Sequence, residues 1–222
     1  MKLSVLIPVY NEESSVSELL RRVLEVPCEK ELVVVDDCST DRTWDVLEAV
    51  DDPRVRVLRH DVNQGKGSAI RTAVGHATGD WVIIQDADLE YDPNDYPRLL
   101  APVERGEAQV VYGVRDLDSQ KFLFRLGNKF LTFATNALYG SHLSDMETCY
   151  KLMPRQVMLD LGLEATRFQI EPEITAKLLR RGIRIVEIPI WYQPRDAEKK
   201  LSAWKDGLPA LWTLLKYRCG PA

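Results

Sequence analysis

Three acidic side chains follow directly after a run of apolar residues. Residues 81–84 are an uninterrupted apolar stretch, typical of a strand buried on both faces of a parallel sheet, and Asp86, Asp88 and Glu90 come next. Open α/β sheets bind ligands beyond the carboxyl ends of their strands. Because carboxylates are hard oxygen donors, this spacing indicates a Mg²⁺ or Mn²⁺ site that leaves positions open for substrate phosphates. A solvated acidic turn is the alternative, since D-x-D patterns are common by chance.

Two more polar segments follow predicted strands. The first strand covers residues 3–7 and is ended by Pro8, and the segment at 8–12 reads PVYNE. The second covers residues 31–35 and runs into Asp36 and Asp37. Parallel neighbouring strands would bring all three segments to one edge of the sheet. Asp37 is a candidate ligand for a ribose or a base, whereas Asp41 is expected to cap the next helix.

The turn at residues 63–67, which reads NQGKG, opens a predicted helix. Backbone N–H groups at a helix start, together with Lys66, could bind phosphate. The signal is weak by itself, because the turn matches neither the Walker A pattern nor G-x-G-x-x-G.

The elements that position these residues alternate between strand and helix. Apolar periodicity predicts helices after a capping box at Ser15 and Glu18, from Asp41, behind Gly67 and near 95–105. Short strands are predicted at 55–58 and 109–112. This alternation indicates βαβ units, an α/β fold with a mostly parallel sheet, and one domain over residues 1–222.

Composition is that of an ordinary globular protein. The 222 residues are 45% hydrophobic and 28% charged, with no run long enough to cross a bilayer, and the chain starts in a strand rather than a signal peptide. These features predict a cytoplasmic location. The four cysteines lack the spacing of a zinc site or a disulfide framework.

Charge is divided unevenly along the chain. Residues 1–113 hold 12 basic and 22 acidic residues, a net charge of −10, whereas residues 114–222 hold 17 and 12, a net charge of +5. The acidic first half argues against nucleic-acid binding. The basic second half suits an anionic partner, either a phosphate or an anionic membrane surface, although a solvated basic face gives the same count.

Four segments together carry a family resemblance. Residues 7–12, 35–41, 63–67 and 85–88 read IPVYNE, VDDCSTD, NQGKG and QDAD. Their order resembles that of inverting family 2 glycosyltransferases with the GT-A fold, a Rossmann-like α/β/α sandwich. The resemblance covers nearly the whole chain. It is greatest to dolichyl- and polyprenyl-phosphate sugar synthases, which transfer a hexose from a nucleotide sugar to a lipid phosphate.

The resemblance implies roles for residues in the first half, 1–113. The metal and the donor diphosphate would be held by Asp86, Asp88 and Glu90, although relatives often have Gln at the position of Glu90. The nucleoside pocket would be lined by Pro8, Tyr10, Glu12 and Asp37.

The second half, 114–222, would hold the acceptor. A largely apolar helix at 121–139 carries a polar stripe that includes Arg125, Asn128 and Lys129. Such a stripe can face water, or its basic residues can face an acceptor phosphate while the phenylalanines meet lipid. The family has arginines at the positions of Arg115 and Arg125 for this phosphate, and Lys129 is a weaker candidate.

The segment at residues 145–151 reads DMETCYK and resembles the family pattern D-x-x-x-G-[FY]-[KR], with Cys149 in place of glycine. Asp145 or Glu147 could be a general base, as in relatives that use sugar hydroxyl acceptors. A phosphate acceptor is already largely a dianion at pH 7, so Asp145 is expected to orient the site instead.

Basic residues near the C-terminus complete the expected site. Related synthases place an arginine and a G-x-S-K motif here, and this chain keeps Arg195 followed by Lys199 and Lys200. Arg195 and Lys200 are expected to reach the donor diphosphate, with Lys199 as an alternate. The helical face that Leu208, Leu211, Trp212 and Leu215 share would pack on its own domain or lie on a bilayer.

The resulting prediction is a metal-dependent inverting hexosyltransferase. It would use a UDP- or GDP-sugar, Mn²⁺ or Mg²⁺, and a polyprenyl phosphate at the cytoplasmic face of a membrane, with catalysis by Asp88, Arg115, Arg125 and Asp145. One rival is a transferase to a saccharide or protein hydroxyl with Asp145 as its base. The second rival is a nucleotidyltransferase, but the glycine-rich loop that this class has near its first strand is missing from this sequence. The third rival is a non-catalytic nucleotide-sugar binder.

Overall fold

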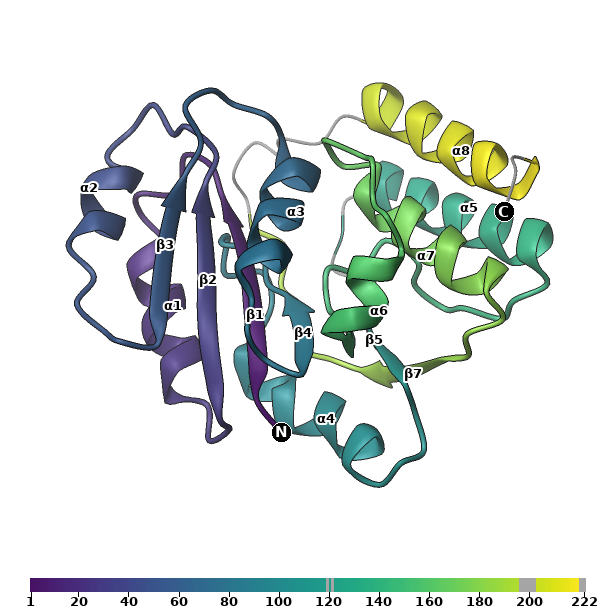
Figure 1. Cartoon of the computed structure of the whole chain (residues 1–222). Coiled ribbons are helices and arrows are strands. Elements are labelled where there is room, and N and C mark those ends of the chain that lie inside the picture. The colour runs from purple at the N-terminus through teal and green to yellow at the C-terminus, as the bar shows by residue number, and fades with distance from the viewer. Residues whose placement is uncertain (119, 121, 196–202, 220–222) are drawn as a thin grey trace.

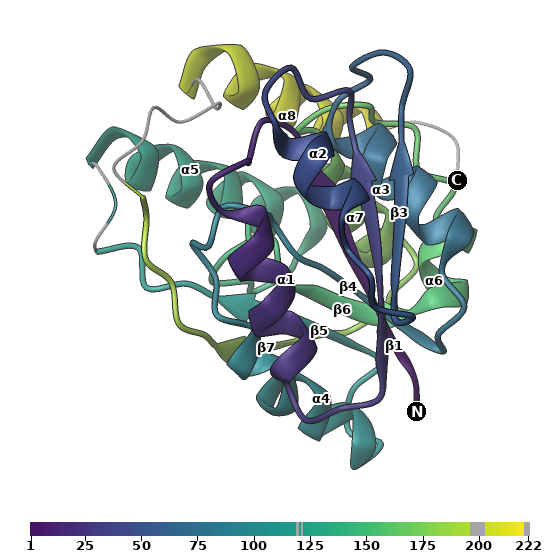
Figure 2. The ribbon, with the colours of Figure 1, turned by 90° about the vertical axis from the view of Figure 1, so that its left-hand side faces the viewer.

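The fold is built on a single sheet with helices on both faces. The computed structural model describes residues 1–118, 120, 122–195 and 203–219. Its seven described strands lie in the order β3-β2-β1-β4-β6-β5-β7. Figure 1 shows β3, β2, β1 and β4 side by side, and β6 is labelled in Figure 2. Their bounds are β1 Leu3–Val9, β2 Lys30–Asp36, β3 Val55–Arg59, β4 Trp81–Ile84, β5 Val110–Val114, β6 Lys151–Pro154 and β7 Ile185–Pro189.

The helices cover the sheet in the manner of a doubly wound fold, and Figures 1 and 2 place α1 and α3 on opposite faces. Their bounds are α1 Val16–Glu25, α2 Thr43–Glu48, α3 Lys66–His76, the short 3₁₀ helix η1 Pro93–Asp95, α4 Tyr96–Glu104, α5 Phe122–Tyr139, α6 Arg155–Asp160, α7 Ile170–Arg180 and α8 Ala203–Cys219.

Strands β3, β2, β1 and β4 form the parallel part of the sheet. Leu6 of β1 pairs with Val33 of β2 on one side and with Ile84 of β4 on the other. The three polar segments predicted to share one edge of the sheet therefore do follow neighbouring strands. Strand β6, which was not predicted, runs antiparallel between β4 and β5.

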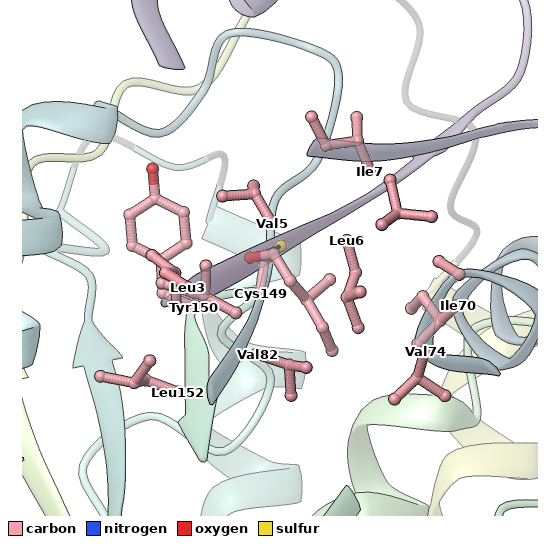
Figure 3. Close-up of a cluster of buried hydrophobic side chains, with 14 of the residues drawn as sticks. Leu3, Val5, Leu6, Ile7, Ile70, Val74, Val82, Cys149, Tyr150 and Leu152 are labelled. Atoms are coloured by element: carbon pink, nitrogen blue, oxygen red, sulfur yellow. Dashed lines mark hydrogen bonds between the residues drawn. The ribbon is translucent and has the colours of Figure 1, made fainter. Parts of the chain in front are cut away.

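The core lies around β1, whose leucine, isoleucine and valine side chains are all buried. Figure 3 shows Leu6 on the side of Ile70 and Val74 of α3, with Leu3 beside Tyr150. A strand covered on both faces needs a continuous apolar run, which is why β1, β2 and β4 were recognisable in the sequence. Burial of each such side chain stabilises the fold by roughly 1.5–3 kcal/mol.

Two local predictions were wrong. Pro8 does not end the first strand, which continues to Val9. The capping box is not formed either, because Ser15 Oγ donates to Glu12 Oε2 at 2.7 Å while Glu18 pairs with Arg21 and Arg22. Glu12 thus takes the hydroxyl that was expected to cap α1.

Helices α5 and α8 pack together through a small second cluster that includes Leu131, Met146, Ala210 and Leu214. The predicted face of α8 is divided, because Leu208 and Trp212 are exposed while Leu214, just beside that face, is buried. Among the described helices, none combines the length and the apolar character that a membrane crossing requires.

Candidate active site

A cavity of about 390 Å³ opens beyond the carboxyl ends of β1, β2 and β4. Residues from both halves of the chain line it. The eleven residues among them that the sequence singled out are Pro8, Tyr10, Glu12, Asp37, Lys66, Asp86, Asp88, Glu90, Arg115, Glu147 and Arg195.

The loops that leave these three strands hold unusual backbone conformations. Asn11, Cys38 and Leu89 have φ of 50°, 59° and 62°, and they follow β1, β2 and β4 in turn. A left-handed conformation at a non-glycine residue is uncommon and costs about 1–3 kcal/mol, and it is concentrated at ligand sites. Each of the three strands is therefore followed by a strained turn where its chain reaches the cavity.

Asp37 is a hub for the loop that leads to α3. Its carboxylate accepts hydrogen bonds from the backbone N–H groups of Gln64 and Gly65 at 2.9 and 2.7 Å, and it lies 2.7 Å from His60 Nδ1. Gly65 has φ of 93°, and a Cβ added there would lie 2.5 Å from the carbonyl oxygen of Thr166. Asp37 thus lines the predicted nucleoside side while it fixes the turn beside it.

The start of α3 is not an open phosphate site. The N–H groups of Gln64 and Gly65 donate to Asp37, and that of Ser68 donates to the carbonyl of Thr166 at 3.1 Å. Lys66 Nζ instead lies 2.8 Å from Asp86 and 2.7 Å from Glu171 of α7. Lys66 therefore links the segment after β4 to α7 through ion pairs with one carboxylate on each.

The three acidic residues after β4 have different surroundings. Glu90 accepts hydrogen bonds from the Tyr192 hydroxyl at 2.9 Å and from the backbone of Arg195 at 3.1 Å. Burial, and then the charges of Asp86 and Glu90, raise the pKa of Asp88 to about 7. Within the described residues, no three His, Cys, Asp or Glu side chains are grouped as a metal site. The three predicted ligands are thus close in sequence but not gathered around one point.

The donor set nevertheless fits a divalent cation. Seven carboxylates but four cationic side chains line the described cavity. An anionic ligand would meet excess negative charge there, and a cation bound by Asp86 and Asp88 would offset it. Burial is the main cause of the raised pKa of Asp88, and repulsion from the neighbouring carboxylates adds to it. Such repulsion favours either a proton or a metal.

Arg115 and Asp145 form a bidentate ion pair beside the cavity. Arg115 Nε and Nη2 donate to the two carboxylate oxygens at 2.7 and 2.8 Å, and the Arg115 backbone N–H adds a bond at 3.2 Å. Asp145 is fully buried and does not line the cavity. With both oxygens engaged, Asp145 is placed to orient Arg115 rather than to remove a proton.

Glu147 lines the cavity two residues later, and its Oε1 is buried without a hydrogen-bond partner among the described residues. Burial and the charge of Glu171 raise the pKa of Glu147 to about 7, although the charges of Lys151 and Arg115 act against this shift. Burial lowers the pKa of Lys151 to about 8.

Cys149 in place of glycine causes no backbone strain, because its φ is not positive.

Arg125 does not reach the cavity. It donates to Asp118 at 2.9 Å and lies over the Phe122 ring, and the cavity is lined instead by Phe124 and Asn128 of the same helix. The polar stripe was recognised, but its cavity-facing member is Asn128.

Lys199 and Lys200 lie outside the described residues. Cavity residues to which the sequence assigned no role include Tyr91, Gln120, Phe124, Asn128, Arg167, Phe168, Glu171 and Tyr192.

Comparison with known proteins places this chain in a family. Residues 4–162 match the family described as glycosyl transferase family 2. An undecaprenyl-phosphate 4-deoxy-4-formamido-L-arabinose transferase of Edwardsiella ictaluri is 33% identical, over 96% of this chain and 65% of that protein. An undecaprenyl-phosphate mannosyltransferase of Micrococcus luteus is 30% identical, over 99% of this chain and 100% of that protein. The chain spans 51% to 65% of the length of the first curated relatives it matches.

The fold also matches a solved structure. Glucosyl-3-phosphoglycerate synthase of Mycobacterium tuberculosis, in complex with Mn²⁺, UDP and glucosyl-3-phosphoglycerate, superposes with a TM-score of 0.81. The two proteins are 22% identical, and the match covers 100% of this chain and 81% of that structure. The predicted GT-A fold is therefore confirmed. The chain belongs to glycosyl transferase family 2.

Proposed function

We propose that the protein transfers a hexose from a nucleotide diphosphate sugar to a polyprenyl phosphate in a metal-dependent, inverting reaction. The observation that carries this proposal is that one continuous cavity joins Asp86 and Asp88 after β4 to Arg115 and to Asn128 of α5. The two relatives named above, whose names specify undecaprenyl phosphate, support the lipid acceptor.

On the donor side, Asp86 and Asp88 would hold Mn²⁺ or Mg²⁺. When bound, the metal would stabilise the negative charge that develops on the leaving diphosphate. Pro8 and Tyr10 would line the nucleoside, and Asp37 would hold the adjoining turn. Arg195 lies at the cavity with its guanidinium on Glu12, so it can adjust toward the diphosphate once a donor is bound. We assign Glu90 to positioning Tyr192 and Arg195 rather than to the metal.

On the acceptor side, Arg115 would hold the phosphate in line with the anomeric carbon, on the face opposite the leaving group. Asp145 fixes its guanidinium beforehand, so little reorganisation is needed at the moment of reaction. No general base is required for a phosphate dianion. Arg125, which lies outside the cavity, would act only where lipid approaches.

Peripheral contact with a membrane fits the exposed apolar side chains of α5 and α8. Phe122, Phe133 and Trp212 are 71%, 70% and 68% exposed, and the two helices pack side by side, as Figures 1 and 2 show. Lys129 on α5 and Lys216 on α8 are exposed too. Aromatic and basic side chains together suit an anionic bilayer surface.

A panel of UDP- and GDP-sugars with Mn²⁺, with and without a short-chain polyprenyl phosphate, tests the proposal. We expect nucleoside diphosphate release that requires both lipid phosphate and metal and is lost in Asp88→Ala. Donor binding without lipid-stimulated turnover would contradict the polyprenyl acceptor and favour a hydroxyl acceptor. For that second candidate the observation in favour is Glu147, a carboxylate that lines the cavity where Asp145 does not.

A further inference from the structure

Two carboxylate oxygens of the cavity lining, Glu147 Oε1 and Glu171 Oε1, are buried and accept no hydrogen bond from the described residues, but Glu171 Oε1 lies 2.7 Å from Lys66 Nζ. Glu147 Oε1 is shielded from solvent and accepts no hydrogen bond from any described residue, yet its side chain lines the cavity together with Arg115 and Asn128. A buried polar atom without a partner costs about 1–3 kcal/mol, so such an atom at a ligand cavity points to a partner supplied by the ligand.

We propose that Glu147 binds the acceptor in its protonated form, donating a hydrogen bond from its carboxyl group to an oxygen of the acceptor phosphate. This inference rests on the proposed function and adds a residue that recognises the phosphate. The proton stays on the carboxyl group or is shared with the phosphate oxygen, and no bond to carbon changes. Glu147 is then a binding residue rather than a base.

Among the described side chains, none forms an ion pair with Glu147. Lys151 is fully buried, but its Nζ donates to the backbone carbonyls of Met146 and Thr148, and the described ion pairs do not join it to Glu147. Arg115 is engaged by Asp145. A proton is therefore the simplest way to neutralise this carboxylate.

The charges around Glu147 support protonation near neutral pH. The charged groups that act on it are Glu171 from α7, Lys151 from β6, Arg115 after β5, and Asp145. Two are negative and two are positive, so burial decides, and the pKa of Glu147 rises to about 7. A phosphate dianion brought beside it would favour the protonated form further.

The charge of the cavity argues against an ionised Glu147 during binding. Carboxylates already outnumber cationic side chains along the described lining. An ionised Glu147 would repel a phosphate dianion, whereas a protonated carboxyl donates to it. The unpartnered oxygen, the cavity and the surrounding charges thus give the same assignment.

The test is calorimetric titration of the full chain with geranyl phosphate and Mg²⁺, from pH 7 to 9, in two buffers with different heats of ionisation. Because the phosphate is a dianion throughout this range, a requirement for protonated Glu147 weakens binding by roughly tenfold per pH unit above 7. For the wild type we expect this slope, together with proton uptake above pH 7.

Glu147→Gln keeps a hydrogen-bond donor but cannot titrate. We expect its affinity at pH 7 to stay within about threefold of the wild type, its slope above pH 7 to be lost, and its proton uptake to disappear. Glu147→Ala should bind weakly at every pH. Glu25→Gln, an exposed change on α1, is the matched control and should keep the wild-type slope.

Two results would overturn the inference alone. One is a wild-type slope retained in Glu147→Gln. The other is intact lipid binding in this variant with loss of turnover, which would make Glu147 a base. If the wild type bound geranyl phosphate at no pH and released no nucleoside diphosphate with any lipid phosphate, the proposed function itself would fall, and the inference with it. As a control for folding, thermal unfolding is measured for each variant, and a cooperative transition is expected.

Discussion

Arg195 and Glu12 meet as a bidentate pair across the mouth of the cavity. The guanidinium nitrogens Nη1 and Nη2 each lie 2.8 Å from a carboxylate oxygen of Glu12. Glu12 follows β1, whereas Arg195 follows β7 at the far edge of the sheet. The same segment is held by Glu90, which accepts from the backbone of Arg195. The last described residues before α8 are thus attached to the donor side.

This pair predicts strong coupling between its two members. Arg195→Ala and Glu12→Gln should each lower kcat/KM for the donor by roughly 10- to 100-fold, and the double variant should lose far less than the sum. Partly buried charge pairs give coupling energies of about 0.5–3 kcal/mol. A double-mutant cycle on donor kinetics measures this, and additive losses would show that the pair does not act as a unit.

Asp88 predicts a pH dependence of stability. Its pKa in the folded protein is raised to about 7, from an ordinary value of 3.8. Between about pH 4 and 7 the folded state therefore holds more protons than the unfolded state, so the free energy of unfolding falls as pH rises. Asp88→Asn should remove the contribution of Asp88 to this pH dependence and raise the free energy of unfolding at pH 8 by about 2 kcal/mol.

Urea unfolding at pH 5 and pH 8 measures the effect, and Mn²⁺ should stabilise the wild type more than Asp88→Asn at pH 8. The pH dependence that Glu147 contributes should remain in the Asp88 variant. Equal responses of both proteins to pH and to Mn²⁺ would contradict this assignment.

Asp145→Asn distinguishes an orienting residue from a base. Since Asn keeps one acceptor for Arg115 but loses the charge, we expect acceptor KM to rise by about tenfold or more while measurable kcat remains. Steady-state kinetics with lipid phosphate gives the two parameters. Near-complete loss of kcat in a folded variant, with KM unchanged, would instead support a catalytic base.

Gly65 and Gly75 provide a matched pair at the two ends of α3. Gly65→Ala places a Cβ against Thr166 at positive φ, so we expect a loss of about 1–3 kcal/mol in stability together with weaker donor binding. Apart from its chain neighbours and the nearby backbone of α3, no described atom lies within 4 Å of a Cβ added at Gly75, so Gly75→Ala should stabilise the helix by about 0.5–1 kcal/mol. Thermal unfolding and nucleotide titration compare them.

The exposed aromatic residues of α5 and α8 predict binding to vesicles. Phe133→Ser and Trp212→Ser together should reduce co-sedimentation with anionic liposomes by about tenfold or more, with little change in stability, because both side chains are exposed. Val62→Ser, an exposed change in the loop before α3, serves as the control. Unchanged sedimentation of the double variant would exclude this surface.

Sequence patterns revealed the donor side because its signals are local. Apolar runs identify β1, β2 and β4, and their ends carry Glu12, Asp37 and Asp86 within a few residues. Neighbouring parallel strands then bring these ends together. The fold class and most of the donor-side lining followed from these local patterns.

The acceptor side depends on contacts between distant residues. Periodicity showed that α5 has a polar stripe, but it could not decide whether Arg125 or Asn128 faces the cavity, because the two are neighbours on that stripe. The pairing of Lys66 with Glu171 joins residues on different elements, and no local pattern encodes it. Strand β6 is short and begins with a buried lysine, so it lacked the apolar run of the other strands.

The position of β6 bears on how such enzymes can be recombined. Although it belongs to the second half of the sequence, it pairs with β4 through Val82 and Met153 and separates β4 from β5. A cut near residue 113 would therefore leave the donor half with an open strand edge in the middle of its sheet. Donor and acceptor halves cannot be exchanged between relatives as independent modules, and a chimera must keep the β4–β6 register if it is to fold.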